Sequence, residues 1–443
     1  MQELMQLRLA AREIFEETLR AVDTGDAVRH AIHVEGSHLS IGDITREISS
    51  RKVYSIAIGK AAARMAAAID DVMGQTFTSG IITSSSAALS QVKLSSRWQR
   101  FEAGHPEPND HSLAAASTAF DLLDRANEER AVVIFLISGG GSAMIECPIN
   151  NNISLADLGA ANKVLVNCGA SIAEINSVRR AFSAVKGGRL AARAPSCDQV
   201  TLIVSDVPKG QEWIVASGPT VAPPADAPNA RDVIDRYELR GQLPKSIVRV
   251  IESEADAAAE HSTQVGPYFV LLDNEVALNA AAEAARQRGF ITEIAFDISD
   301  QPIVGGCDQL LSRLEQLRAK RRGSGKTICL ISGGEFACPV RGEGIGGRNL
   351  ETALRLAQSE HFASFNVAAL CAGTDGIDGN SPAAGAIADS TTFERARKIE
   401  LDAEDFLRRS DSYSFFIALG DVIATGATGT NVRDIRLLIS ETD

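Results

Sequence analysis

Glycines gather where apolar segments of the sequence end, and such glycine-rich strand ends often bind phosphate. The apolar run at 131–138 ends in Gly139, Gly140 and Gly141, which Ser142 follows. Glycine lets backbone N–H groups approach an oxyanion closely and adopts positive φ, and a serine hydroxyl adds a donor. The pattern predicts an anion-binding loop, and an ordinary strand-to-helix turn is the alternative.

A second glycine-rich segment, at 341–347, stands directly before a predicted helix at 348–359. Free backbone amides and the positive end of a helix dipole favour a phosphate at such a position. Arg348 lies at the junction, where its planar guanidinium could bridge two phosphate oxygens. The segment is neither a Walker A loop nor a dinucleotide-binding fingerprint. A flexible surface loop with a solvated arginine is the alternative.

Charged residues follow two further apolar runs. Lys60 comes directly after the run at 53–59, and Asp375 and Asp378 stand among glycines after the run at 367–373. A lysine at a strand end can reach a phosphate as a point charge. Carboxylates in such a place can hold Mg²⁺ or accept a hydroxyl proton. The alternatives are a solvated lysine and a pair of Asx turns.

A basic segment at 176–189 places Arg179, Arg180, Lys186 and Arg189 around a pair of glycines. Such a concentration of cations could form a wall against an anionic ligand. A charged, solvated helix face is the alternative.

The strands that must position these residues are predicted from continuous apolar runs, which are typical of parallel sheets covered on both faces. The predicted strands are 53–59, 80–83, 131–138, 200–206, 268–273, 327–332 and 367–373. Helical stretches between them include 60–74, 110–129, 275–288 and 348–359. The alternation predicts an α/β fold with mostly parallel sheets, whose ligands lie beyond the carboxyl ends of the strands.

Two domains are expected because the chain has 443 residues, and a single core rarely grows beyond about 250–300. A proline-rich segment at 221–246 suggests the boundary, which gives domains 1–240 and 241–443. The amphipathic N-terminal helix could pack on either domain. The sequence Leu-Ile-Ser-Gly-Gly occurs at 136–140 and again at 330–334, so each domain is expected to carry one Ser-Gly-Gly loop.

Composition excludes several classes of partner. The net charge is −13 and aromatic residues make up 5% of the chain, which argues against nucleic acid and anionic membranes. The longest apolar run, 131–137, is too short to span a bilayer. Seven cysteines without a CxxC pair indicate a reducing, cytoplasmic compartment.

Taken together, these segments resemble the glycerate 2-kinase family, whose C-terminal half is the MOFRL domain and whose members are also labelled hydroxypyruvate reductases. The resemblance covers nearly the whole chain, and the order of the motifs matches as well as their content. The matching stretches are AIGKAA at 57–62, EAGHPEPND at 102–110, LISGGGSA at 136–143, NSVRRAFSAVKGGRLA at 176–191, SDV at 205–207, ASGPT at 216–220, ISGGE at 331–335, GGRN at 346–349, AGTDGIDG at 372–379 and TGTNV at 428–432.

The resemblance implies an N-terminal Rossmann-like domain, a C-terminal MOFRL-type domain and an active site in the cleft between them. It implies ATP- and Mg²⁺-dependent phosphorylation of D-glycerate to 2-phosphoglycerate, with Lys60 and Arg348 as catalytic residues. Both stand at loop junctions outside apolar runs, so their replacement is expected to spare folding. D-glycerate and ATP are the expected partners, with no nucleic acid and no membrane, and a homodimer is a possible assembly.

Other residues complete the expected site. The metal ligand is expected to be Asp206 or Asp375. The expected nucleotide- and substrate-binding residues are Ser138, Gly139, Gly140, Gly141, Ser142, Asn176, Arg179, Lys186, Ser332, Gly333, Gly334, Glu335, Gly346, Gly347 and Asn349.

This sequence departs from the family pattern near two of these residues. Pro208-Lys209-Gly210-Gln211-Glu212 replaces the acidic segment that usually follows SDV, and Phe336 replaces a common threonine. The departures concern substrate identity more than fold. The alternatives are a kinase for a related small hydroxy acid, a hydroxypyruvate reductase, and a catalytically inactive metabolite-binding relative.

Overall fold

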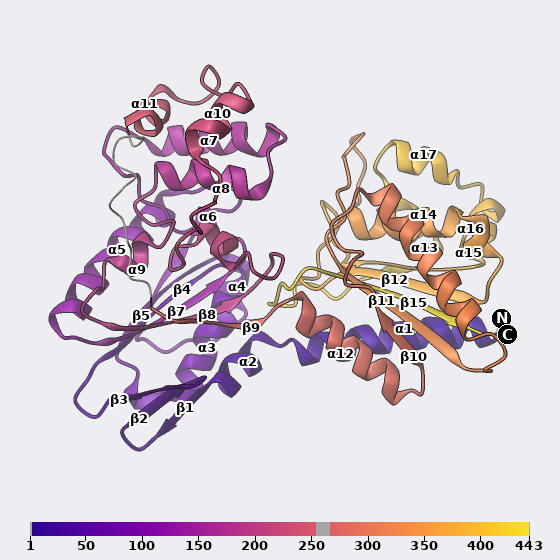
Figure 1. Ribbon diagram of the computed structural model, residues 1–443, viewed down its shortest axis with the longest axis horizontal. Coiled ribbons are helices and arrows are strands. Elements are labelled where there is room, and N and C mark those ends of the chain that lie inside the picture. The colour runs from indigo at the N-terminus through magenta and orange to yellow at the C-terminus, as the bar shows by residue number, and fades with distance from the viewer. Residues whose placement is uncertain (1, 254–265, 443) are drawn as a thin grey trace. The chain divides into compact units, whose positions relative to one another are not determined.

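The computed structural model describes residues 2–253 and 266–442, and the chain divides into two compact units (Figure 1). We call Thr24–Leu271 the middle unit. Met1–Asp23 and Leu272–Asp443 together form the terminal unit, which contains both chain ends. The sequence placed the boundary at 240, whereas the contacts place it after Leu271.

The middle unit is built on a sheet of six strands in the order β6-β5-β4-β7-β8-β9. The ladders that join β6, β5, β4, β7 and β8 are all parallel, as predicted. The strands are β4 (Val53–Ile58), β5 (Ser79–Ser84), β6 (Trp98–Glu102), β7 (Val132–Ser138), β8 (Asp198–Val204) and β9 (Tyr268–Leu272). Each of the five predicted strands of this unit is present.

Helices and a small second sheet complete the α/β core of this unit. Helix α5 (Asp110–Glu128) buries Ala119 and Leu123 against Ile56 and Phe135 of the sheet. Helix α3 (Ala62–Met73) contacts β4, β5 and β7, and α2 (Thr24–Ala31) contacts α3. The antiparallel sheet consists of β1 (Ile32–Glu35), β2 (His38–Ile41) and β3 (Ile44–Glu47).

A helical cluster in the middle unit explains why the boundary differs from the predicted one. Val233, Ile234 and Ile247 pack into one apolar core with Leu158 and Val178. Residues after 240 therefore belong to this cluster, and the proline-rich segment leads into it instead of linking two domains. The helices are α7 (Leu155–Asn167), α8 (Ile172–Ala181), α10 (Ala230–Arg236) and α11 (Lys245–Ser253) (Figure 1).

The terminal unit has a six-stranded sheet in the order β10-β11-β15-β12-β13-β14. Among its described strands only β10 and β11 pair in parallel, so the expectation of mostly parallel sheets is wrong for this unit. The strands are β10 (Ile291–Ile294), β11 (Thr327–Gly334), β12 (Val367–Gly373), β13 (Gly385–Asp389), β14 (Val422–Ile423) and β15 (Asp434–Glu441).

Strands that the sequence did not predict account for the mixed topology: β13 pairs antiparallel with β12 and β14, and β15 lies in the middle of the sheet. Strand β15 runs antiparallel between β11 and β12, which therefore point in the same direction. Asp434, its first residue, lies opposite Gly334 of β11 and Gly373 of β12. Two strand ends and one strand start thus meet at a single edge of the sheet.

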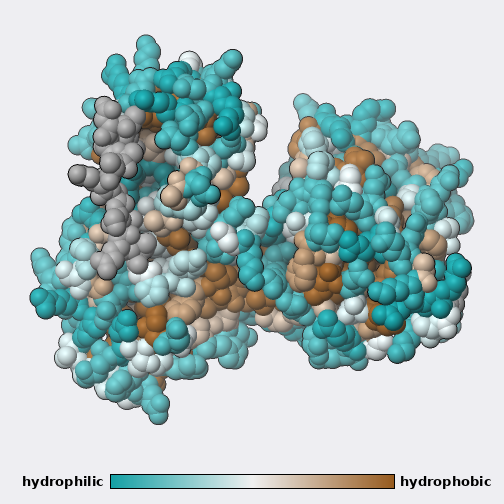
Figure 2. Space-filling view, in the orientation of Figure 1, coloured by the Kyte–Doolittle hydropathy of each residue, from teal (hydrophilic) through white to brown (hydrophobic). Residues whose placement is uncertain are grey.

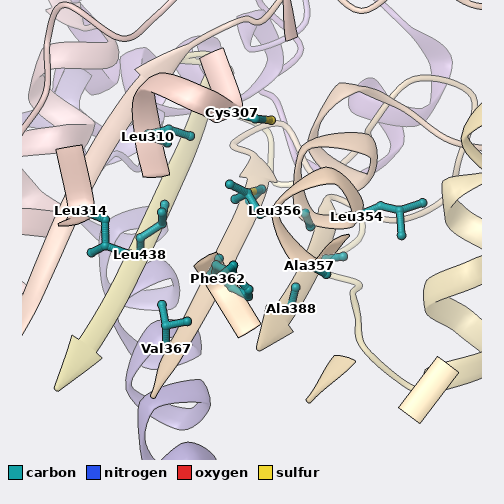
Figure 3. Packing of buried hydrophobic residues seen from close by; sticks show 14 of the residues in the cluster. Cys307, Leu310, Leu314, Leu354, Leu356, Ala357, Phe362, Val367, Ala388 and Leu438 are labelled. Carbon is teal, nitrogen blue, oxygen red and sulfur yellow. The ribbon is translucent and has the colours of Figure 1, made fainter. Parts of the chain in front are cut away.

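Helices cover both faces of this sheet. On one face α13 (Ile303–Lys320) and α14 (Arg348–Gln358) enclose an apolar core that includes Leu314, Leu354 and Leu438 (Figure 3). On the other, α12 (Asn274–Gln287) contacts β11, and α1 (Gln2–Ala21) contacts β12 and β15. The N-terminal helix therefore packs in the terminal unit, where Arg8 pairs with Asp389 and Asp421.

Hydrophilic side chains cover most of the visible face of each unit (Figure 2). Within residues 2–253 and 266–442 no helix is long and apolar enough to cross a membrane. The remaining helices are η1 (Gly74–Thr76), α4 (Ser86–Ser90), α6 (Gly141–Met144), α9 (Arg189–Ala192), η2 (Glu212–Ser217), α15 (Glu360–Ala363), α16 (Thr392–Lys398), α17 (Ala403–Arg408) and α18 (Ser412–Leu419).

Candidate functional site

In the middle unit, Lys60 lies against the glycine loop that follows β7. Because β4 and β7 are parallel neighbours, their carboxyl ends lie side by side at one edge of the sheet. The Lys60 N–H donates to the carbonyl of Gly139 at 2.9 Å. The Ala61 N–H donates to Ser138 Oγ at 3.0 Å. Two segments far apart in the sequence are thus joined into one loop cluster.

Two positions of this loop have no room for a side chain, because charged side chains lie close to its backbone. A Cβ at Gly139 would collide with the carboxylate of Asp206, which comes just after β8. A Cβ at Gly140, where φ is +79°, would lie 2.9 Å from Lys60 Cγ. Both an acidic and a basic side chain therefore reach the backbone of the loop.

His105 joins this cluster, and the sequence analysis missed it. Its ring lies 3.4 Å from the position that a Cβ of Gly140 would occupy. Desolvation, together with the positive charges of Lys60 and Arg179, lowers the pKa of His105. The signal was present in the stretch EAGHPEPND, where His105 stands between a glycine and a proline after a strand.

Hydrogen bonds link several predicted residues of the middle unit. Ser142 Oγ and Ser217 Oγ lie 2.8 Å apart, and Ser217 donates to Asn176 Oδ1 at 2.9 Å. Arg179 donates to the same oxygen at 3.3 Å and also to Asn162. Ser217 has a φ of +64°, and strained backbone of this kind often occurs at functional sites. The network holds two hydroxyls and one guanidinium in fixed positions.

Lys186 is part of the protein interior. Its side chain is 2% exposed and forms an ion pair with Glu146, which is 5% exposed. Burial lowers the pKa of Lys186, although the Glu146 carboxylate opposes this. Arg180 lies over the ring of Trp213, 5.0 Å from its centroid. The basic segment is therefore divided, with Arg179 in the polar network and Lys186 in a buried pair.

In the terminal unit, Arg348 opens α14 and is surrounded by carboxylates. Its Nε and Nη2 donate to Asp434 at 2.5 and 3.1 Å, and Nη2 lies 3.0 Å from Glu335 Oε1. Burial alone would lower the pKa of Arg348, but the carboxylates of Asp434, Glu335 and Asp378 raise it. The guanidinium is a fixed, permanent positive charge at the edge where β11, β12 and β15 meet.

The amides at the start of α14 are already engaged, contrary to expectation. The Asp378 carboxylate accepts from the N–H groups of Asn349 at 3.1 Å and Leu350 at 2.8 Å. A Cβ at Gly347 would collide with that carboxylate, and the Gly346 N–H donates to Asn380 at 2.8 Å. Desolvation, reinforced by the charge of Asp434, raises the pKa of Asp378 to about 7. A protein carboxylate, and not an open phosphate cradle, therefore caps this helix.

The loop after β11 is also bonded to protein groups. The Gly334 N–H donates to Asn274 at 2.9 Å, and the Glu335 N–H donates to Asp300 at 3.1 Å. Arg436 donates to the hydroxyl of Ser332 and to the carbonyls of Gly333 and Gly334. This loop therefore does not offer the amides of Gly334 and Glu335 to a phosphate, and the side chain of Glu335 faces Arg348.

Asp206 and Asp375 are placed so that each could contribute to a magnesium site. Asp375 Oδ1 accepts from the Ile377 N–H at 3.1 Å, and it would lie 3.4 Å from a Cβ at Gly373. The described part of the chain has no group of three or more His, Cys, Asp or Glu side chains placed to hold a metal. Mg²⁺ is commonly held by one or two carboxylates together with substrate phosphates, so either residue fits that ion.

The fold and the two clusters define a protein of two α/β units with charged side chains at its strand ends. A family model described as a domain of unknown function, DUF4147, matches residues 10–252, and the MOFRL family model matches residues 328–434. The glycerate 2-kinase of Pyrococcus horikoshii is 32% identical over 98% of both chains. The chain therefore belongs to the glycerate kinase family.

Further relatives and solved structures agree with this placement. Human glycerate kinase is 30% identical over 98% of this chain and 93% of its own length. The crystal structure of a glycerate kinase from Thermotoga maritima has a TM-score of 0.80 at 30% identity, covering 98% of this chain and all of that chain. A Pyrococcus horikoshii structure has a TM-score of 0.78 at 31% identity. The resemblance noted in the sequence is confirmed.

Proposed function

We propose that this protein is a glycerate 2-kinase, which transfers the γ-phosphoryl group of ATP to the 2-hydroxyl of D-glycerate. The observation that carries the proposal is the group formed by two cations, Lys60 and Arg179, and the imidazole of His105 beside the glycine loop after β7. Full-length relatives with this activity in their names support the same function.

Phosphoryl transfer depends on positioning and on neutralising charge more than on covalent chemistry. Lys60 and Arg348 neutralise the transferred phosphoryl group or the glycerate carboxylate. Ser142 and Arg179, held by Asn176 and Ser217, orient the small acid. Mg²⁺ supplied with ATP neutralises phosphate charge, and Asp206 or Asp375 would hold it.

The reaction joins the 2-hydroxyl oxygen to the γ-phosphorus and breaks the bond from that phosphorus to the β,γ-bridging oxygen. ADP leaves, and the hydroxyl proton passes to a carboxylate. We propose that this carboxylate is Asp206 or Asp375. Seven free cysteines suit a reducing compartment, and we place the enzyme in the cytoplasm.

A coupled assay tests the function directly. ATP should be consumed only when both Mg²⁺ and D-glycerate are present, and the product should be 2-phosphoglycerate. A panel of small hydroxy acids, each with its phosphorylated product identified, tests the substrate. Formation of 3-phosphoglycerate, or oxidation of NADH by hydroxypyruvate without kinase activity, would contradict the proposal.

A further inference from the structure

A pocket of about 390 Å³ lies in the terminal unit beside the start of α14. Its lining includes Pro339 and Val340 from the segment after β11, glycines of the loop at 341–347, and Arg348 and Glu351 of α14. Pockets for small organic ligands usually measure about 300–1,000 Å³. This volume is larger than a three-carbon acid such as glycerate needs.

The rim of the pocket is preformed. Asn380 bonds the loop on one side, since its N–H donates to Gly346 O and its side-chain amide to Gly344 O, both at 3.1 Å. On the other side the Gly344 N–H donates to Arg409 O, and the Tyr413 N–H donates to Ile345 O, both at 2.9 Å. A loop bonded on both sides keeps its shape before a ligand arrives.

The lining is suited to a flat, mainly apolar ring that carries an amino group. Val340 is 83% exposed, and with Pro339 it contributes an apolar part of the lining. Glu351 has a side chain 4% exposed and bonded to Arg355 at 2.9 and 2.6 Å. Both bonds go to Oε1, and a carboxylate oxygen accepts well from an exocyclic amine.

Charges of both signs line the pocket, because Arg348 and Glu351 stand about one turn apart on α14. Arg348 lines it and is the fixed cation at the start of α14. Its Nε and Nη2 donate to Asp434 and Nη2 also faces Glu335, so the N–H groups of Nη1 are the ones available to a phosphate oxygen. A ligand that carries both an aminated ring and phosphates would meet both charges.

We propose that this pocket holds the nucleoside of the purine nucleoside triphosphate that donates the phosphoryl group, with its phosphates directed toward Arg348. The inference rests on the proposed function and adds that the terminal unit, through its MOFRL region, is the nucleotide-binding part. The adenine amine faces Glu351, and Pro339 and Val340 cover the ring.

Photolabelling with 8-azido-ATP, followed by peptide mapping, tests this placement on the full chain. Label should appear in residues 336–351 or 409–413, and excess ATP should prevent it. Label confined to peptides of the middle unit, in protein that phosphorylates D-glycerate, would overturn the inference and leave the function intact. Wild-type protein without glycerate-dependent ATP consumption would overturn the proposed function, and the donor-site inference with it.

A matched pair of variants gives a second readout. Val340→Trp fills the mouth of the pocket, whereas Val304→Trp adds the same bulk at a position 50% exposed on α13. Val340→Trp should raise the Kd for a fluorescent ADP analogue at least about tenfold, or about 1.4 kcal/mol, without changing the Kd for D-glycerate. Val304→Trp should change neither constant. Equal nucleotide affinity in the two variants would overturn the inference.

Discussion

Arg348 and Asp434 form a bidentate ion pair, in which the Asp434 side chain is 1% exposed and the Arg348 side chain 35%. Asp434 begins β15, whereas Arg348 begins α14, so the pair fixes a helix start to the meeting point of three strands. One edge of the guanidinium donates to the buried Asp434 carboxylate, and part of the side chain is exposed to solvent. This arrangement presents a charge in a defined orientation.

We expect Arg348→Ala to impair both activity and stability. Loss of the guanidinium should lower kcat/KM by at least about a hundredfold, or about 2.7 kcal/mol of transition-state stabilisation. It also leaves Asp434 buried without its cation, which typically costs about 3–5 kcal/mol. The sequence analysis expected folding to be spared, whereas the ion pair with buried Asp434 leads us to expect a loss of stability.

Arg348→Lys separates the two effects, because lysine keeps the charge but not the bidentate geometry. Its urea midpoint should recover most of the lost stability while its kcat/KM stays low. If Arg348→Ala turns over D-glycerate at the wild-type rate, the catalytic role is refuted whatever its stability.

Lys60→Ala should lower kcat/KM by at least about a hundredfold with the unfolding midpoint unchanged. Lys60 is half-buried at a loop, and its backbone, not its side chain, makes the bond to Gly139. Steady-state kinetics and thermal melts check this. Lys93→Ala, an exposed lysine of the same unit, is the control and should behave as wild type.

Sequence patterns located the elements and loops that carry the chemistry. The seven predicted strands are all present, and Lys60, which the sequence analysis proposed as a ligand-binding residue at the carboxyl end of a strand, follows β4. That inference needed only the rule that ligands lie at the carboxyl ends of parallel strands. The resemblance to the family with the MOFRL domain was found from the order and content of sequence motifs alone, without structural information.

What the sequence could not give depends on contacts between distant residues. Asp378 and Asn349 are 29 positions apart, so no local pattern shows that this carboxylate caps α14. Arg436 lies within β15, where a charged residue in an apolar run obscured the strand, and the structure buries it against Phe336. Parallel and antiparallel pairing of doubly covered strands give the same apolar pattern, which explains the mistaken topology of the terminal unit.

The ion pair of Lys186 and Glu146 should be a stability element. Lys186→Met leaves Glu146 charged in the interior, which should lower the free energy of unfolding by about 3–5 kcal/mol. The double variant Lys186→Met/Glu146→Leu removes both charges and should recover most of that loss. Denaturant titrations measure the coupling, and a double variant no more stable than the single would contradict it.

Activity of the folded double variant tests a different point. Lys186 is 1% exposed, so kcat/KM should stay close to the wild-type value if the residue acts only through packing. A hundredfold loss in a stable double variant would instead assign Lys186 to the substrate site.

His105 should make anion binding depend on pH. Its pKa is lowered by burial and by two neighbouring cations, so the imidazole is neutral at pH 7. A bound anion favours the protonated ring, so affinity for D-glycerate should rise about three- to tenfold as pH falls from 8 to 6. His105→Gln should flatten this profile, and isothermal titration in two buffers should detect proton uptake only in wild type. A wild-type profile as flat as that of the variant would contradict the role.

Because of Asp378, the free energy of unfolding of the terminal unit should increase as the pH falls through 7. Its folded pKa of about 7 lies above the ordinary value of 3.8, so between these limits the folded state binds more protons than the unfolded state. This contribution to the free energy of unfolding is complete below pH 3.8, the ordinary pKa, and is lost as the pH rises through the folded pKa of about 7. Asp378→Asn removes the titration. Its one amide oxygen can replace only one of the two carboxylate oxygens that accept from the Asn349 and Leu350 amides, and the cost of losing the other bond does not depend on pH. The free energy of unfolding of wild type, relative to that of Asp378→Asn, should therefore rise by about 1.4 kcal/mol from pH 8 to pH 6. Hydrogen exchange of the α14 amides reports this locally, and a difference independent of pH would show that Asp378 does not titrate in this range.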